Sequence, residues 1–124
     1  MTLPLLVVDA ANVVGSVPDG WWRDRAGAAT RLRDSLATIA EGGLPAFHAG
    51  PLEVVLVVEG KARHVESIPE VRVVAAEHSG DDKIVEVVRT AAPDRPCAVV
   101  TADRELRRRV TELGAEVLGP KSVR

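Results

Sequence analysis

Carboxylate side chains follow several apolar runs of this sequence. Asp9 and Glu59 each end such a run, Asp103 lies just beyond a third, and Asp81 and Asp82 follow a fourth after a short turn. Carboxylates that converge in one crevice repel one another and need a cation, and Mg²⁺ or Mn²⁺ prefers oxygen ligands of this kind. The pattern predicts a divalent-cation site in which Asp9, Asp81, Asp82 and Asp103 are the candidate ligands. An ion held there can activate water for phosphodiester hydrolysis.

A simpler interpretation exists for most of these acids, because Asp is a common N-cap. Asp103 directly precedes an expected helix, and Ser79-x-x-Asp82 resembles a capping box. Asp9 differs because we expect no helix beside it, only a loop, and a charge that closes an apolar strand is costly without a function. Asn12 follows three residues later, and it could bind a phosphate, orient a carboxylate or form an Asx-turn. The combination of Asn12 with the four aspartates predicts a functional site more strongly than any one of these residues does alone.

Candidate substrate contacts lie on either side of the acids. Trp21, Trp22 and Arg23 follow the Asp9 loop and could stack bases and contact phosphate, although packing of at least one Trp in the core is the simpler interpretation. Arg104 and Arg108 share one face of the expected last helix and could reach a phosphate; a solvated helix surface is the alternative.

The expected elements alternate between strands and helices. Near-continuous apolar runs predict strands buried on both faces at Leu3–Asp9, Glu53–Glu59, Val71–Ala76 and Cys97–Thr101, and a last short strand fits Ala115–Leu118. Helical periodicity predicts helices at Arg23–Glu41, Asp81–Ala91 and Asp103–Leu113. This order indicates an α/β fold, a three-layer α/β/α sandwich with a doubly wound parallel sheet of about five strands. Ligands of such sheets bind at the carboxyl ends of the strands, where the acids fall.

Composition excludes several classes of protein. The 124 residues predict a single domain, 1–124, and 46% hydrophobic with 27% charged residues is a globular composition. The net charge of −2 gives no global attraction to nucleic acid, and the single cysteine excludes an internal disulfide or a Cys-based zinc site. No apolar run is long enough to span a bilayer and no leader is evident, so a cytoplasmic location without membrane association is expected. Signatures of dinucleotide, P-loop and serine-hydrolase sites are absent.

The order of short motifs resembles the NYN domain of the PIN-like ribonucleases, within it the YacP-like group. Four segments carry the resemblance: a strand ending in D-x-x-N (Val7–Asn12), a strand ending in an acid (Val57–Glu59), an acidic helix start (Gly80–Glu86) and a strand ending near an acid (Val99–Asp103). The second strand ends in Glu59, where many members have Asp.

This resemblance implies strand order 3-2-1-4-5, an acidic Mg²⁺ or Mn²⁺ pocket and cleavage of single-stranded RNA. It gives Asp9, Asp81 and Asp103 the role of metal ligands, with Asp82 beside or in place of Asp81, and gives Asn12 a supporting role at the catalytic site. A homodimer is left open. Other hypotheses are hydrolysis of a nucleotide phosphoanhydride, a non-catalytic RNA-binding or scaffold module, and the toxin of a toxin–antitoxin pair.

Overall fold

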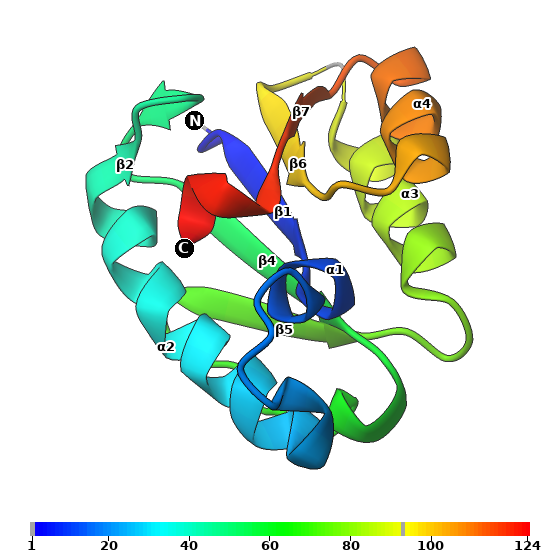
Figure 1. Cartoon of the computed structure of the whole chain (residues 1–124). Coiled ribbons are helices and arrows are strands. Elements are labelled where there is room, and N and C mark those ends of the chain that lie inside the picture. The colour runs from blue at the N-terminus through cyan, green and yellow to red at the C-terminus, as the bar shows by residue number, and fades with distance from the viewer. Residues whose placement is uncertain (1, 93) are drawn as a thin grey trace.

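The chain folds as one parallel sheet with helices on both faces (Figure 1), in a computed structural model that describes residues 2–92 and 94–124. The sheet strands are β1 (Leu5–Asp9), β4 (Glu53–Val58), β5 (Val71–Ala75), β6 (Cys97–Val100) and β7 (Glu116–Leu118). The helices are α1 (Ala10–Gly15), α2 (Arg25–Gly42), α3 (Gly80–Ala91) and α4 (Arg104–Glu112). Short 3₁₀ helices cover Trp21–Arg23, Gly60–Ala62 and Pro120–Val123, and β2 (Gly43–Leu44) pairs with β3 (His48–Ala49).

The strand order β5-β4-β1-β6-β7 confirms the expected 3-2-1-4-5 arrangement. Every pairing in this sheet is parallel, and β1 lies at its centre, with Leu5 opposite Glu53 on β4 and Cys97 on β6. The chain moves outward from β1 in one direction through β4 and β5, then returns to add β6 and β7 on the other side. The strand order therefore reverses beside β1, and a crevice for ligands forms where it does.

Two aliphatic clusters hold the layers together. Alternate residues of β1 point to opposite faces, so that Leu6 and Val8 pack with α1 and α2, whereas Leu5 and Val7 pack with α3 and α4. Figure 1 shows α2 on one side of the sheet and α3 with α4 on the other. All five residues of β1 are buried, which explains its unbroken apolar sequence.

Helix α1 corrects one expectation from the sequence. No helix was expected beside Asp9, yet α1 begins at Ala10, and Asp9 is its N-cap, with the Asn12 amide 3.4 Å from Asp9 Oδ1. A six-residue helix is marginal by itself, and tertiary packing stabilises it. Val13 and Val14 supply that packing because both are buried against the α2 side of the sheet.

Two further elements carried no clear periodic signal. The β2–β3 hairpin follows α2, where Gly43 has a φ of 87° and a Cβ at that position would lie 2.3 Å from the Gly50 nitrogen. Only glycine accommodates both constraints. At the other end, Pro120–Val123 places Val123 in the core, and the Arg124 guanidinium donates to the Val13 carbonyl oxygen at 3.0 Å. The end of the chain thus packs against α1.

The start of α2 offers a test of local stability. Helix α2 begins at Arg25 and not at the expected Arg23, and its N-cap is Asp24, whose Oδ1 accepts the Gly27 amide at 2.9 Å. Replacing Asp24 by alanine should lower the free energy of unfolding by about 1 kcal/mol because that amide loses its acceptor. Asp24→Asn keeps an acceptor and should cost much less. Urea denaturation of the two variants measures the difference, and equal losses would contradict the cap.

Among the described residues, none of the helices combines the length and the apolar character needed to cross a bilayer.

Candidate functional site

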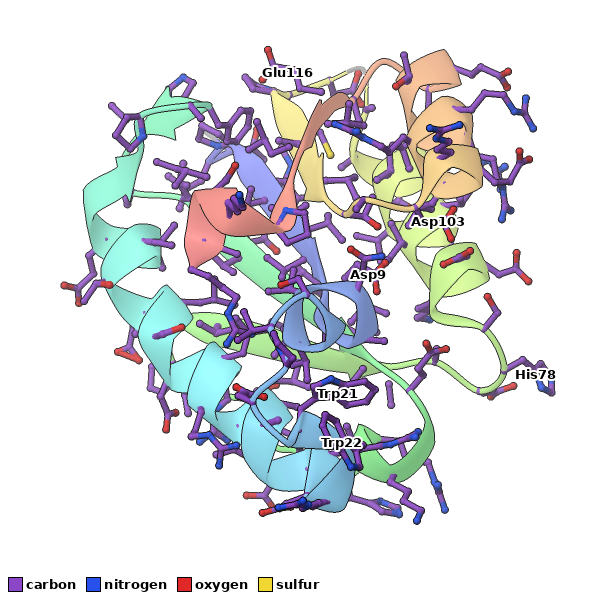
Figure 2. The ribbon with its side chains drawn as sticks, in the orientation of Figure 1. Asp9, Trp21, Trp22, His78, Asp103 and Glu116 are labelled. Carbon is purple, nitrogen blue, oxygen red and sulfur yellow. The ribbon has the colours of Figure 1, made fainter. Side chains whose placement is uncertain are left out.

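The acids gather at the carboxyl ends of the strands, as the sequence predicts. Asp9 ends the central strand β1, and Asp103 follows the neighbouring strand β6 by three residues. The connections after these two strands lead to helices on opposite faces of the sheet, α1 and α4, so an opening forms between them. In Figure 2 Asp9 and Asp103 lie on the same side of the molecule, between α1 and α4.

Asp9 is a buried acid with few partners. Its residue exposure is 6%, and its two oxygens accept hydrogen bonds from the Asn12 amide (3.4 Å) and the Thr101 hydroxyl (2.9 Å). Burial raises the pKa of Asp9 from 3.8 to about 6; the two hydrogen bonds oppose this shift, and the charges of Asp81 and Glu59 add to it. This carboxylate is therefore held in its charged form at an energetic cost.

Thr101 and Asn12 join the strand ends into one network. The Thr101 hydroxyl donates to Asp9 and accepts the Asp103 amide at 3.2 Å, and Thr101 is fully buried. The Asn12 side-chain oxygen accepts the Ala102 amide at 2.8 Å. Asn12 thus fixes the loop between β6 and α4. The Asx-turn that the sequence left open would have fixed the loop of Asn12 itself, whereas this bond fixes a neighbouring one. Sequence reasoning missed Thr101, although a hydroxyl ending an apolar strand was a usable signal.

Three other acids surround this part of the site: Asp81 and Glu59 act on Asp9 through their charges, and Asp103 acts on Asp81. Burial raises the pKa of Asp81, and the charges of Asp103 and Glu59 raise it further. Asp103 is also the N-cap of α4, with its Oδ1 2.9 Å from the Leu106 amide, so the capping interpretation holds beside the electrostatic one. Glu59 Oε2 accepts the Gly80 amide at 2.7 Å and fixes the start of α3. The mutual repulsion places Asp9, Glu59, Asp81 and Asp103 in one electrostatic cluster.

Asp82 differs from the acids of this cluster because its partner is a basic side chain. Its side chain is exposed and forms an ion pair with Arg109 of α4 at 3.1 Å. The N-cap of α3 is Ser79, whose hydroxyl accepts the Asp81 amide at 3.1 Å. Of the two adjacent acids, Asp81 is the one whose charge interacts with Asp103 and Glu59.

The donor set suits a hard cation, but the side chains do not form a closed cage. Within residues 2–92 and 94–124, no three His, Cys, Asp or Glu side chains stand together in a geometry that would hold an ion. Mg²⁺ binds through one or two carboxylates and keeps several of its waters, so it does not require three direct protein ligands. The repulsion among Asp9, Asp81 and Glu59 is what a bound cation would relieve.

The aromatic pair divides into one packed and one exposed ring. Trp21 packs against the core, whereas Trp22 is 52% exposed, as expected for at least one of the two. The rings meet edge to face with centroids 5.9 Å apart, and Arg23 lies 5.9 Å from the Trp22 centroid. Both rings lie on the α2 side of Asp9 in Figure 2.

The two helix arginines differ in their contacts. Arg108 forms ion pairs with Glu105 and Glu112 on the exposed face of α4, which agrees with the solvated-surface alternative. Arg104 is exposed and directly follows Asp103 at the start of α4. His78 lies on the exposed loop that leads to α3, labelled in Figure 2.

Comparison with known proteins identifies the fold. No protein-family model matches this chain, and no curated protein matches its sequence. Two solved structures are similar to it: Rae1 (YacP) from Bacillus subtilis and the W164L mutant of that protein. The mutant superimposes with a TM-score of 0.76 at 16% identity, over 98% of this chain and 72% of that one. Rae1 (YacP) without this mutation superimposes with a TM-score of 0.75 at 15% identity, over 97% of this chain and 71% of that one. The resemblance inferred from the sequence is confirmed at the level of the fold, and this chain has the fold of Rae1 (YacP).

Proposed function

We propose that this chain is a ribonuclease that cleaves single-stranded RNA with the help of Mg²⁺ or Mn²⁺ at the carboxyl ends of β1, β4 and β6. The observation that carries the proposal is Asp9, a buried carboxylate that faces two other acids with only two hydrogen-bond donors. Folding gains nothing from such an arrangement, and perturbed acids of this kind concentrate at functional sites. The fold shared with Rae1 (YacP) supports the same conclusion.

Each residue has a distinct part in the proposed reaction. Asp9 and Asp81 would hold the cation, with the charge of Asp103 acting beside Asp81, and the cation would polarise the phosphate and lower the pKa of water. Asn12 and Thr101 position these acids by fixing the loop between β6 and α4 and by donating to Asp9. Arg104, exposed beside Asp103, would contact a phosphate of the RNA backbone.

Single asparagine substitutions test the proposed chemistry. Asp9→Asn and Asp103→Asn should each lower Mn²⁺-stimulated cleavage of an end-labelled single-stranded RNA by roughly 100-fold or more, because each removes a charge that the cation needs. Asn remains a good N-cap, so Asp103→Asn should keep α4 intact. Cleavage is followed by gel electrophoresis over a metal titration, with a chelator as the zero point.

Asp34→Asn is the matched control because Asp34 is an exposed acid of α2 whose ion pair joins it to Arg33. It should cleave like the wild type. Equal cleavage by the wild type and both site variants would overturn the assignment. RNA binding that is insensitive to metal, without cleavage, would favour the RNA-binding or scaffold module, and turnover of nucleoside triphosphates in place of RNA would favour the phosphoanhydride hydrolase.

A further inference from the structure

A cavity of about 310 Å³ opens beside the acidic cluster, on the α2 side of Asp9. Two of its lining residues, Ala10 and Ala11, directly follow Asp9 in the chain, and Glu59 also lines it. The volume lies at the lower end of the range for small-molecule sites, about 300–1,000 Å³. The cavity therefore has room for one flat ring system, next to the place where a phosphate would bind.

The walls of the cavity are apolar and small. Its lining includes Ala10, Ala11, Val14, Ala29, Ala62 and the indole of Trp21. Trp21 is held in place from two directions, because the Arg25 guanidinium lies 5.4 Å from its ring centroid and Trp22 meets it edge to face. Arg25 lines the cavity as well. An aromatic ring and a guanidinium plane are the two protein surfaces on which single-stranded bases stack.

Glu59 is the acidic side chain among the polar residues that line this cavity, beside Arg25 and His78, and it connects the cavity to the acids. One of its carboxylate oxygens, Oε2, accepts the Gly80 amide, and among the described residues no hydrogen bond reaches Oε1. Its charge acts on both Asp9 and Asp81, so the cavity and the acidic cluster meet at this side chain. A carboxylate oxygen can only accept, and it therefore selects a ligand that donates.

We propose that this cavity is a nucleobase subsite, formed by Trp21, Arg25 and Glu59, which binds one base of the RNA and prefers bases that carry an exocyclic amino group. The inference rests on the proposed ribonuclease function and names its base preference. Cytosine presents an amino donor at position 4, where uracil presents an oxygen that would face the Glu59 carboxylate. The subsite therefore favours cytosine over uracil, and Glu59 acts in base selection as well as in the charge of the cluster.

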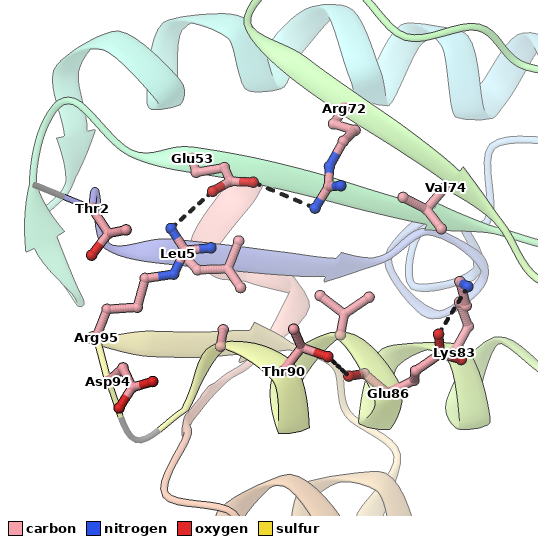
Figure 3. A pocket seen from close by; sticks show the side chains of 12 residues that line it. Thr2, Leu5, Glu53, Arg72, Val74, Lys83, Glu86, Thr90, Asp94 and Arg95 are labelled. Atoms are coloured by element: carbon pink, nitrogen blue, oxygen red, sulfur yellow. Dashed lines mark hydrogen bonds and ion pairs between the residues drawn. The ribbon is translucent and has the colours of Figure 1, made fainter.

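A second cavity, larger than the proposed subsite, has different chemistry. It measures about 500 Å³ and lies along α3 and the amino ends of β1 and β4 (Figure 3). Five of its charged side chains form ion pairs, since Glu53 pairs with Arg72 and Arg95, and Lys83 pairs with Glu86. None of the described residues that line it belongs to the acidic cluster, so we assign it no ligand.

The fluorescence of Trp21 tests the subsite directly. Trp22→Phe leaves Trp21 as the only tryptophan of the chain, and titration with hexacytidylate or hexauridylate RNA in EDTA reports binding without cleavage. We expect saturable quenching, with the cytidylate bound roughly 5-fold or more tightly than the uridylate. Trp21→Phe leaves only Trp22, and its fluorescence should not show this selective quenching. Circular dichroism confirms that both variants fold.

Glu59→Gln supplies the matched test of selectivity because its amide can both donate and accept. The preference for cytidylate should fall to about 2-fold or less, while Trp21 quenching remains. Absence of Trp21 quenching, or equal affinity of the Trp22→Phe variant for the two oligonucleotides, would overturn the subsite even if the protein cleaves RNA. Selective quenching in a protein without cleavage would support the subsite and contradict the proposed enzyme, so the two failures are distinguishable.

Discussion

Replacing Asp9 by asparagine should stabilise the protein by about 2 kcal/mol at pH 7.5 in EDTA, while it abolishes the proposed cleavage. The stabilisation follows from the pKa of Asp9, which burial raises from 3.8 to about 6. In the wild type the free energy of unfolding falls as the pH rises from 3.8 to about 6, because the unfolded chain releases the proton of Asp9 at a lower pH than the folded chain does. Above pH 6 the full cost is present, about 3 kcal/mol for a shift of this size.

Asparagine has no charge to desolvate, so the variant avoids this cost. Its side chain has one acceptor oxygen where the carboxylate has two, so it no longer offers a separate oxygen to the Asn12 amide and to the Thr101 hydroxyl, and this loss reduces the expected gain to about 2 kcal/mol.

Urea denaturation of both proteins between pH 3.5 and 8 measures the effect. The difference in free energy of unfolding should be near zero or slightly unfavourable below pH 4, rise through the window from 3.8 to about 6 and stay constant above it. Comparing the two proteins at each pH cancels the titration of the other acids. A pH-independent difference, or a less stable variant at pH 7.5, would show that the Asp9 carboxylate is not held charged at a cost.

Replacing Thr101 by valine should have the opposite effect on stability. The side chain keeps nearly the same shape and stays fully buried, but its hydroxyl no longer donates to Asp9 or accepts the Asp103 amide. We expect a loss of about 2–3 kcal/mol at pH 7.5, since a buried charge loses one of its two donors. The loss should shrink below the pKa of Asp9, where the neutral carboxyl needs that donor less. Cleavage should also decline.

Thr101→Ser is the control because it keeps the hydroxyl and removes one methyl group. It should retain the pH dependence of the wild type, apart from a small loss of packing. The double variant Asp9→Asn/Thr101→Val should be more stable than the sum of the single changes predicts, since the charge that needs the hydroxyl is gone. Equal pH profiles for the valine and serine variants would remove Thr101 from the network.

The fold could be predicted in its main lines because burial on both faces leaves a direct mark on sequence. Apolar runs marked β1, β4 and β6 as strands covered on each side, whereas β5, for which the same was expected, lies at one edge of the sheet and is only partly buried. Helix α3 shows the clear spacing of Ile84, Val88 and Ala91. Helix α1 was missed because it has only six residues, too few to establish a period. The β2–β3 hairpin was missed for a similar reason, since two-residue strands carry no alternation.

The candidate site could be predicted only as a set of acids at strand ends. Asp103 could have been only an N-cap, and Asp9, beside which no helix was expected, is an N-cap as well. What distinguishes the two from ordinary caps is their electrostatic interaction with Asp81, which lies 72 positions from Asp9 and 22 from Asp103, and, for Asp9, deep burial. A local sequence pattern cannot reveal interactions between residues so far apart in the chain.

The sequence by itself determined the doubly wound α/β class, the place of the acids at the carboxyl edge and the aliphatic core, because these follow from local polarity and from the handedness of parallel crossovers. The strand order came only from the resemblance to a known family. Only the tertiary structure decided which acids interact electrostatically. It also decided that Asp82 pairs with Arg109 and that Thr101 and Asn12 connect the loops. It also placed Trp21 and Glu59 around one cavity. Desolvation and hydrogen bonding act between groups that meet in space, and their strength depends on the neighbours that folding supplies.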